Sequence, residues 1–274
     1  MKDKTVFWLS FYAAMLFLFA VGTISYGIFI APLQVKSDLS QETAGVSQSP
    51  ADINILACAR EDDRSLPDHF ALICISPQRG QIAVTNLPDD LVIDFGSRCD
   101  SPTQCYAYAG ILQVVSGLKD KNIDIDHYID ITLPHLQTVV DTLGPFLFTV
   151  PTPVYSYDER GLLQFKQPAG EGLLGGIQVC GVLKYSDLSG QNYTALWLDM
   201  LHKALQTYFT AENISELPSI YKALCDGLST DISILDIDAI QKNMTALMAV
   251  TQVSFVCPQN YSVDDFYFTL EDYF

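Results

Sequence analysis

The segment from Asp52 to Leu91 constrains the fold more than any other part of this 274-residue chain. It contains short, mostly apolar runs bounded by turn residues, a pattern typical of strands buried on both faces. The expected strands are Ile53–Cys58, Phe70–Ile75 and Ile82–Leu87. Acidic side chains collect at the strand ends, at Glu61, Asp62, Asp63, Asp68, Asp89 and Asp90. The segment therefore predicts a buried sheet with a charged site at one edge.

The composition supports one large packed domain and disfavours one class of partner. Apolar residues make up 49% of the chain, which is ample for a hydrophobic core. The 32 acidic and 15 basic residues give a net charge of −17. Because phosphate contacts need clustered Lys and Arg, we expect no nucleic-acid partner. The same acidity disfavours broad docking of a polyanionic acceptor.

An uncharged apolar run near the N-terminus predicts a membrane anchor. Val6–Leu33 carries no charged side chain over 28 residues, more than the roughly 20 that span a bilayer. Lys2 and Lys4 precede it, so the positive-inside rule places residues 1–5 in the cytoplasm. We expect a single-pass signal anchor (6–33), a polar linker (34–49) and an extracytoplasmic domain (50–274). A cleaved signal peptide is the alternative, but the run is long for one and lacks an evident A-x-A site.

The remaining chain predicts helices around the sheet. Leu and Tyr at helical spacing predict a helix over Ala195–Thr210, and two more are expected over Ile214–Leu228 and Asp236–Ala249. Val253–Cys257 has the pattern of a strand, and we expect the aromatic tail Tyr261–Phe274 to pack on the core.

Cysteine and histidine spacing gives no metal motif. The seven cysteines are odd in number, so at least one thiol is unpaired. Cys99 with Cys105 and Cys225 with Cys257 are the pairs that the chain could form. The four histidines are scattered, which disfavours a structural zinc site.

Several short segments between residues 50 and 270 follow one another in a recognisable order. They are Asn54–Leu56 with Glu61, Leu66–His69, Ser76–Pro77, Asn86–Asp90, Tyr106–Tyr108, Asn122–Tyr128, Leu136–Val150 and Leu174–Lys184. In that order they resemble the motifs of the LytR-CpsA-Psr (LCP) family, membrane-anchored phosphotransferases that move a glycopolymer from a polyprenyl pyrophosphate carrier onto peptidoglycan. The resemblance implies an α/β fold: an α-β-α sandwich with a central mixed β-sheet flanked by helices, preceded by one transmembrane helix. It also implies an apolar tunnel for the polyprenyl chain.

The chain departs from this family at the arginines that clamp the pyrophosphate through bidentate hydrogen bonds. Leu66 stands at the arginine of the family's RSDT motif, Asp89 at the arginine of SIPRD, and Ser101 at a lysine before the AYAFG-like segment. Lys184 and Ser186 replace the paired arginines of YVRxR, and Tyr193–Leu198 replaces GRxxRQ, with Thr194 at its first arginine. One charged hydrogen bond contributes roughly 1.5–3 kcal/mol, so these losses predict weak phosphate binding.

The first functional hypothesis is an active enzyme that uses Mg²⁺ to attach glycopolymer from polyprenyl pyrophosphate to peptidoglycan. One or two carboxylates plus phosphate oxygens are a common Mg²⁺ site. The residues assigned are Glu61 and Asp68 for the metal, Arg60, Arg64 and Lys184 for the pyrophosphate, and Asp90 as the catalytic group.

The second hypothesis is a catalytically impaired relative that keeps the fold and anchor. It would bind a wall glycopolymer, peptidoglycan, a polyprenyl-phosphate lipid or a protein partner. The missing arginines favour it over the enzyme. An extracytoplasmic adhesion or scaffold domain unrelated to the family is a third reading.

Overall fold

The structure is a computed structural model that describes residues 51–67, 69–95, 98–186, 193–250, 252–260 and 262–274. The predicted span 6–33, the linker 34–49 and the candidate ligand Asp68 lie outside the described residues. Within the part that is described, no helix combines the length and apolarity needed to cross a bilayer. The chain divides into two units, Met1–Ser49 and Pro50–Phe274, and the second contains all the described residues.

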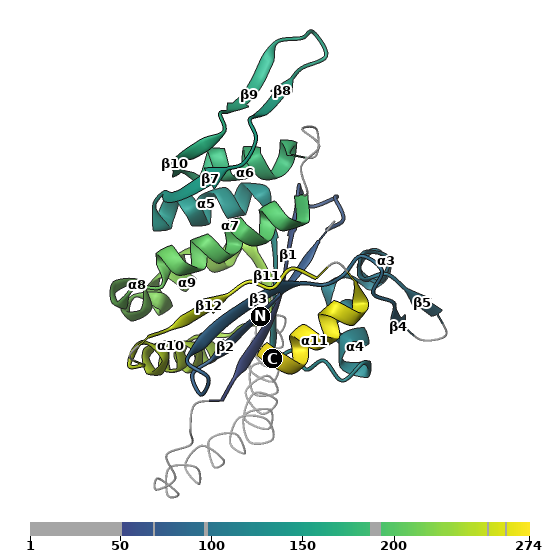
Figure 1. Cartoon of the computed structure of the whole chain (residues 1–274), viewed down its shortest axis with the longest axis vertical. Helices are drawn as coiled ribbons and strands as arrows, with labels where there is room; N and C mark the ends of the chain where they lie inside the picture. The colour runs from purple at the N-terminus through teal and green to yellow at the C-terminus, as the bar shows by residue number, and fades with distance from the viewer. Residues whose placement is uncertain (1–50, 68, 96–97, 187–192, 251, 261) are drawn as a thin grey trace, which may run out of the picture. The chain divides into compact units, whose positions relative to one another are not determined.

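A mixed six-stranded sheet forms the centre of the domain (Figure 1), with strand order β11-β6-β1-β2-β3-β12. Strands β1, β2 and β3 form an antiparallel meander, and β6 pairs parallel to β1. β12 lies parallel to β3, and β11 lies antiparallel to β6. The strands are β1 (Ile53–Arg60), β2 (Phe70–Ser76), β3 (Gln81–Asn86), β6 (His127–Thr132), β11 (Leu228–Thr230) and β12 (Ser254–Val256). The expected strands at 53–58, 70–75, 82–87 and 253–257 are thereby confirmed.

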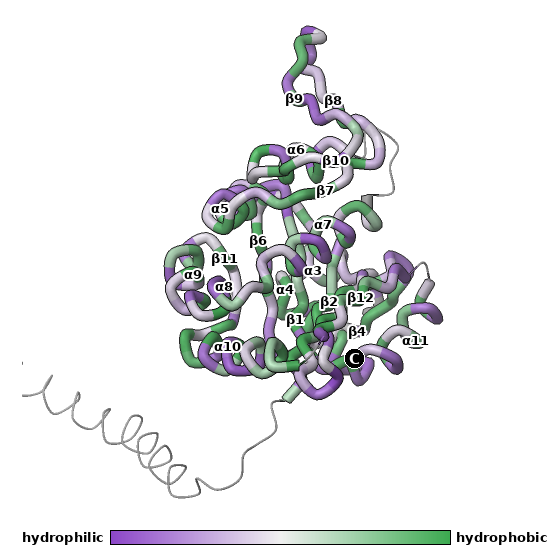
Figure 2. Tube along the Cα trace, turned by 60° about the vertical axis from the view of Figure 1, so that its left-hand side comes forward, coloured by the Kyte–Doolittle hydropathy of each residue, from purple (hydrophilic) through white to green (hydrophobic). Residues whose placement is uncertain are grey.

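Both faces of the sheet are covered, which explains why its central strands are apolar throughout. Successive side chains of a strand point to opposite faces. Ile53 and Ile55 of β1 belong to one hydrophobic cluster, whereas Leu56 and Cys58 belong to the other. Figure 2 shows hydrophobic colour along much of β1 and β2. All seven residues of β2 are buried, so no alternation of polar and apolar side chains appears in its sequence.

Helices form the outer two layers. One face is covered by α5, α6, α7 and α10 and the other by α3, α4 and α11, which contribute buried side chains to the two clusters. The predicted α-β-α sandwich is confirmed. The described helices are α3 (Pro102–Ala109), α4 (Ile111–Asp120), α5 (Leu133–Leu143), α6 (Gly176–Tyr185), α7 (Tyr193–Tyr208), α8 (Ala211–Ser215), α9 (Leu217–Leu224), a 3₁₀ turn (Cys225–Gly227), α10 (Ile234–Met248) and α11 (Val263–Tyr273).

The predicted helices agree with these elements apart from one interruption. The expected helix over 214–228 is divided into α8, α9 and the 3₁₀ turn, because Pro218 has no amide hydrogen and favours the start of a new helix. The aromatic tail forms α11, whose Phe266 is fully buried, so its packing on the core is confirmed.

Three two-stranded sheets complete the domain. They are β4 (Ile93–Phe95) with β5 (Arg98–Asp100), β7 (Phe146–Val150) with β10 (Gly170–Leu174), and β8 (Val154–Tyr157) with β9 (Leu163–Gln167). The β8–β9 hairpin, residues 154–167, projects beyond the rest of the domain (Figures 1 and 2), and we call it the arm. Its turn is fixed by the carboxylate of Asp158, which accepts hydrogen bonds from the backbone N–H groups of Arg160 and Leu162. Gly161 in this turn has φ +77°, a conformation that glycine adopts without strain.

Three of the six described thiols are buried and the other three are partly buried. Cys58 and Cys74 lie in the strand core, and burial raises the pKa of Cys74 to about 12. Cys225 and Cys257 are both free, so the possible disulfide between them is not formed. The side chain of Cys99 lies outside the described residues.

Candidate functional site

A cavity of about 390 Å³ opens at the carboxyl end of β1. Because β1 and β6 are parallel, their carboxyl ends meet at the same edge, the usual position of a ligand site in an α/β sheet. Arg60 and Glu61 come from the end of β1, Leu133 from the start of α5, and Lys184 from the last turn of α6. Three of the predicted site residues, Arg60, Glu61 and Lys184, are thus brought together.

Arg60 is held by a buried carboxylate. Its Nε lies 2.7 Å from Oδ1 of Asp130 on β6, and the two side chains are only 11% and 5% exposed. The hydroxyl of Tyr106 on α3 donates to Oδ2 of Asp130 at 2.5 Å. Although burial favours the neutral guanidine, the hydrogen bond and charge of Asp130 raise the pKa of Arg60. Burial, followed by the hydrogen bond to Asp130, raises the pKa of Tyr106 well above its usual range.

Lys184 is also paired with a carboxylate. Its Nζ lies 2.5 Å from Oε1 of Glu61, and the hydrogen bond to Glu61 raises the pKa of Lys184. These side chains are 40% and 55% exposed, so the pair is at the mouth of the cavity rather than inside the protein. Both cations in the cavity are therefore compensated by the chain's own acidic groups.

Arg64 and Asp90 lie outside this cavity. Arg64 is exposed on the loop after β1, where its backbone N–H donates to Oδ1 of Asp62. That hydrogen bond and one from Ser65 lower the pKa of Asp62, so this acidic residue stabilises the turn. Asp90 is exposed and lines a neighbouring cavity of about 360 Å³ with Asp89 and Thr194.

Most of the positions at which the resemblance expects phosphate-binding cations line adjoining cavities. Leu66 and Lys184 line the first cavity, Asp89 and Thr194 the second, and Asp89 with Ser101 a third of about 190 Å³. His69 lines both the first and the third cavity. The alignment of motifs therefore corresponds to a real cluster in space, although only Lys184 keeps a cationic side chain there.

The imidazole of His69 lies near both the carboxylate of Asp89 and the hydroxyl of Thr194. Nδ1 of His69 lies 3.8 Å from Oδ1 of Asp89 and 3.1 Å from Oγ1 of Thr194. The Asp89 side chain is 81% exposed, so its negative charge is presented to the cavities that it lines. Ser186, at another expected arginine, is fully buried and is not a lining residue of these cavities.

The described residues do not fit a resident metal ion. None of them forms a group of three or more His, Cys, Asp or Glu that could hold a metal. The Oε1 atom of Glu61 is in contact with the Lys184 ammonium, which competes with a cation for that oxygen. A Mg²⁺ ion would therefore depend on Asp68, outside the described residues, and on oxygens supplied by a phosphate ligand.

An apolar cavity lies between α7, α8, α9 and α10, but it is small. Its volume is about 130 Å³, and its walls include Leu205, Tyr208, Ile214 and Met244. Drug-sized ligands usually occupy about 300–1,000 Å³, so a polyprenyl chain does not fit this cavity without a rearrangement of the helices.

Sequence reasoning missed the residues that hold Arg60 in place. Asp130 is a lone acidic residue in the strand HYIDIT, and a buried strand carries such a charge only when it is paired. This signal indicates that Asp130 is paired, but nothing in the sequence identifies Arg60 as its partner. The resemblance includes Tyr106 in a motif without giving it a role, and no pattern in the sequence assigns a role to His69.

Comparison with known proteins supports both the fold and the order of motifs. The model of the LytR_cpsA_psr family matches residues 36–272. The polyisoprenyl-teichoic acid–peptidoglycan teichoic acid transferase TagU of Bacillus cereus is 23% identical over 197 residues, which are 66% of this chain and 61% of TagU. The chain thus spans less than two thirds of the length of that relative.

Solved structures show the same fold at low sequence identity. A structure titled as a putative transcription regulator from Eubacterium siraeum has a TM-score of 0.67 at 19% identity and covers 82% of this chain and 89% of its own. A LytR-Csp2A-Psr enzyme from Actinomyces oris has a TM-score of 0.58 at 19% identity, covering 76% of this chain and 80% of its own.

Proposed function

This chain belongs to the LytR-CpsA-Psr family, and on that basis we propose that it binds a polyprenyl-linked wall glycopolymer at the cavity cluster and transfers it poorly or not at all. We also propose that residues 6–33 anchor it in the cell membrane with the domain outside. The uncharged 28-residue run supports the anchor. Membrane fractionation of the full chain against one lacking residues 1–36 tests this arrangement, and a full chain found in the soluble fraction would exclude it.

The observation that carries the functional proposal is the charge of the converging positions. Leu66, Asp89, Ser101 and Thr194 line the cavities where cations are expected, and none of them is cationic. Lys184 is the expected position that keeps a cationic side chain, and its Nζ lies 2.5 Å from Oε1 of Glu61. Phosphoryl transfer depends chiefly on positioning and on neutralising charge around phosphorus, so an exposed carboxylate at Asp89 opposes both.

An active Mg²⁺-dependent phosphotransferase is the alternative. The convergence of Arg60, Glu61 and Lys184 on one cavity favours it, because a pyrophosphate could displace Glu61 from Lys184 and recruit Mg²⁺. In that case Glu61 and Asp68 would hold the ion, Arg60, Arg64 and Lys184 would bind phosphate oxygens, and Asp90 would orient the site from the neighbouring cavity. Heat of Mg²⁺ binding at millimolar concentration, in the presence of inorganic pyrophosphate, would support this alternative.

The deciding experiment measures transfer of labelled glycopolymer from a polyprenyl pyrophosphate donor to peptidoglycan, with TagU as the positive control. We expect the rate to fall far below that of TagU. A comparable rate would overturn the proposal of impairment.

Restoring the clamp then tests the site itself. The triple variant Leu66→Arg, Asp89→Arg and Thr194→Arg should bind inorganic pyrophosphate at least about ten-fold more tightly, because a charged hydrogen bond contributes roughly 1.5–3 kcal/mol. Ser186 is left unchanged, since an arginine does not fit its fully buried position. A control for added surface charge places arginines on α10 and α11, at Leu235 and Phe268, which are 79% and 68% exposed, together with Glu271→Gln and Asp272→Asn, so that both variants change the net charge by four units. Equal affinity of a folded triple variant and the control would refute the assignment of the site.

A further inference from the structure

We infer that the outer face of the arm is a docking strip for the glycan strand of peptidoglycan. The strip consists of Tyr155, Tyr157, Leu163 and Lys166. This inference rests on the proposed function, since it names the surface on which a polymeric acceptor or wall ligand lies.

The arm has one buried face and one exposed face. Val154 and Ser156 of β8 are 0% and 5% exposed, whereas the alternating Tyr155 and Tyr157 are 39% and 60% exposed. Tyr155 pairs across the hairpin with Lys166, and Tyr157 pairs with Leu163. Directly paired residues point to the same side of a sheet, and a register shift between Ser156 and Tyr157 places Leu163 opposite Tyr157, so these four side chains share the outer face.

The exposed rings stand on a rigid support. Phe165, on the buried face of β9, lies so close to Gly181 of α6 that a Cβ atom at this glycine would come within 2.0 Å of its ring. The same ring packs on Tyr185, with centroids 5.6 Å apart. Because this packing already holds the arm in place, ligand binding to its outer face should cost little conformational entropy.

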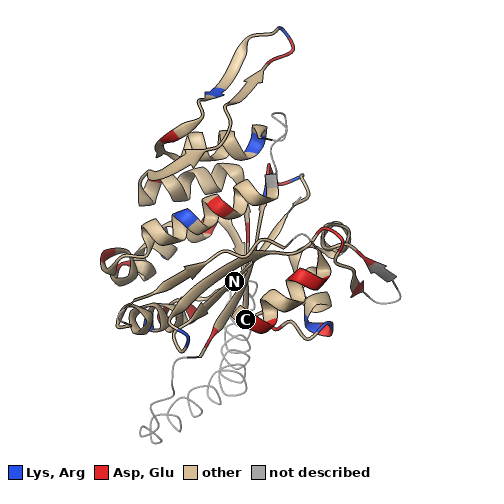
Figure 3. Cartoon of the chain, viewed as in Figure 1, with Lys and Arg blue, Asp and Glu red and all other residues tan. Residues whose placement is uncertain are grey.

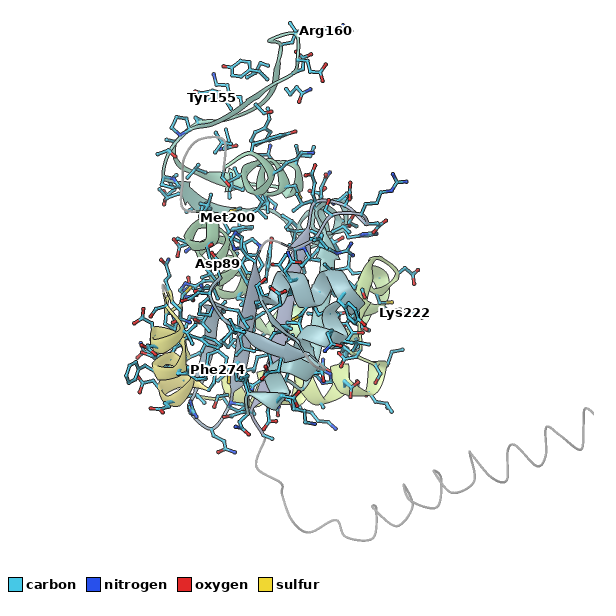
Figure 4. All side chains as sticks on the ribbon, turned by 90° about the vertical axis from the view of Figure 1, so that its right-hand side faces the viewer. Asp89, Tyr155, Arg160, Met200, Lys222 and Phe274 are labelled. Carbon is cyan, nitrogen blue, oxygen red and sulfur yellow. The ribbon has the colours of Figure 1, made fainter. Side chains whose placement is uncertain are left out.

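The support leads directly to the charged cavity. Tyr185, which packs on Phe165, comes directly after Lys184 in α6. The Nζ atom of Lys184 lies 5.6 Å from the Tyr185 ring centroid, and Lys184 lines the cavity. The support of the arm is therefore continuous with the wall of the cavity. Figure 4 shows Tyr155 and Arg160 on the arm and Asp89 in the body of the domain.

The chemistry of the strip suits a carbohydrate. Sugar rings have apolar C–H faces, which pack on aromatic rings, and polar edges, which need hydrogen-bond partners. Tyr155 and Tyr157 are two residues apart in a strand, a backbone separation of about 7 Å, so each ring can pack on a different sugar unit of one chain. The ammonium of Lys166 lies 6.0 Å from the Tyr155 ring centroid and can donate to hydroxyl or acetyl oxygens beside that ring.

The size of the strip argues against a protein partner. A stable protein interface buries about 800 Å² on each side. Four partly exposed side chains offer on the order of 300–400 Å², because even a fully exposed aromatic side chain contributes about 150–250 Å². The tip carries both acidic and basic residues (Figure 3), which also disfavours insertion into a lipid surface.

The position of the arm fits a ligand in the wall. Residues 1–50 join the domain just before Ile53, at the start of β1, whereas the cavity and the arm's support are at the end marked by Arg60. The point where the chain enters the domain and the support of the arm are therefore at opposite ends of β1.

The test is co-sedimentation of the full chain, in detergent, with purified insoluble peptidoglycan. The double variant Tyr155→Ala and Tyr157→Ala should bind about five-fold more weakly or worse, the loss expected when two aromatic contacts are removed. Tyr155→Phe with Tyr157→Phe should retain most of the binding, because stacking needs the ring rather than the hydroxyl. The matched control is Tyr267→Ala on α11, which is 37% exposed and should bind as the wild type does.

The outcomes separate this inference from the proposed function. No binding by the wild type, or equal binding by the folded Ala double variant, would overturn the docking strip and leave the transfer and pyrophosphate measurements unaffected. Lys184→Ala probes the cavity separately, because Lys184 lines the cavity and is not part of the strip. Loss of binding in Lys184→Ala alone, with the Ala double variant unaffected, would place the contact in the cavity and refute the strip.

Discussion

The two ion pairs at the end of β1 differ in the environment of their charges. Arg60 and Asp130 are 11% and 5% exposed and share their site with Tyr106, whereas Lys184 and Glu61 are 40% and 55% exposed at the mouth of the cavity. A buried pair leaves an uncompensated charge in the interior when one partner is removed, while water solvates the remaining member of an exposed pair. The first pair therefore maintains the architecture, and the second can open for a ligand.

This contrast assigns different roles to Arg60 and Lys184, for which the sequence predicted the same role. Both were expected to bind phosphate. Arg60 already donates to Asp130 and to the backbone carbonyl of Asp62, so few of its donors remain for a ligand. Lys184 needs only to exchange one exposed carboxylate for a phosphate oxygen, which makes it the better phosphate-binding candidate.

Breaking the buried pair should have the largest effect. Asp130→Ala leaves the Arg60 guanidinium without its carboxylate and should lower the free energy of unfolding by about 3–5 kcal/mol. Urea denaturation followed by circular dichroism measures this loss. The control, Glu61→Ala at the exposed pair, should cost less than about 1 kcal/mol. Similar losses in the two variants would show that burial does not separate the pairs.

The hydroxyl of Tyr106 should have an intermediate effect that depends on pH. Its pKa in the folded protein is raised above the ordinary 10.0, so the folded state holds this proton more tightly than the unfolded chain. The resulting stability is fully present below about pH 10 and is lost as the pH rises toward the folded pKa.

Tyr106→Phe tests this linkage. The variant should lose about 0.5–1.5 kcal/mol at neutral pH, from the hydrogen bond to Asp130, and should show a flatter decline of stability above about pH 10. Unfolding free energies measured across that range provide the comparison, with Tyr157→Phe on the exposed arm as the control. An unchanged alkaline slope in Tyr106→Phe would mean that Tyr106 does not titrate with folding.

Breaking the exposed pair of Lys184 and Glu61 should have the smallest effect on the free energy of unfolding. Its main effect should be on the affinity for pyrophosphate. Glu61→Gln should alter the unfolding free energy by less than about 1 kcal/mol. It should also release Lys184 and raise the affinity for inorganic pyrophosphate by about three- to ten-fold. Calorimetry of Glu61→Gln against Glu171→Gln on the exposed face of β10 isolates the effect. Unchanged affinity would indicate that Lys184 does not bind phosphate, contrary to its assigned role.

Much of the fold was predictable because local patterns record which faces are buried. The apolar runs at 53–58, 70–75 and 82–87 became β1, β2 and β3, and the helical spacing of Leu196, Leu201 and Leu205 became α7. Asp68 and the side chain of Cys99 cannot be compared, since they lie outside the described residues. The family motifs also identified positions that line adjoining cavities, because their order along the chain fixes which strand ends and loops they occupy.

The pairing of charges was not predictable in this way. Arg60 and Asp130 are 70 residues apart, and Lys184 follows Glu61 by more than one hundred residues, so neither pair leaves a local pattern. Periodicity shows that Asp130 belongs to a strand, but only the parallel register of β1 and β6, with Cys58 opposite Asp130, brings it beside Arg60.

The sequence by itself determined the strands β1, β2, β3 and β12 and the helical segments from α7 to α10, because these follow from residue type and spacing along the chain. The absence of cations at the clamp positions was read from the family resemblance. The tertiary structure alone decided that Asp130 buries Arg60, that Glu61 covers Lys184 and that the arm exposes its tyrosines. Each of these depends on distances between separate elements, and electrostatic and packing energies change steeply over a few ångströms.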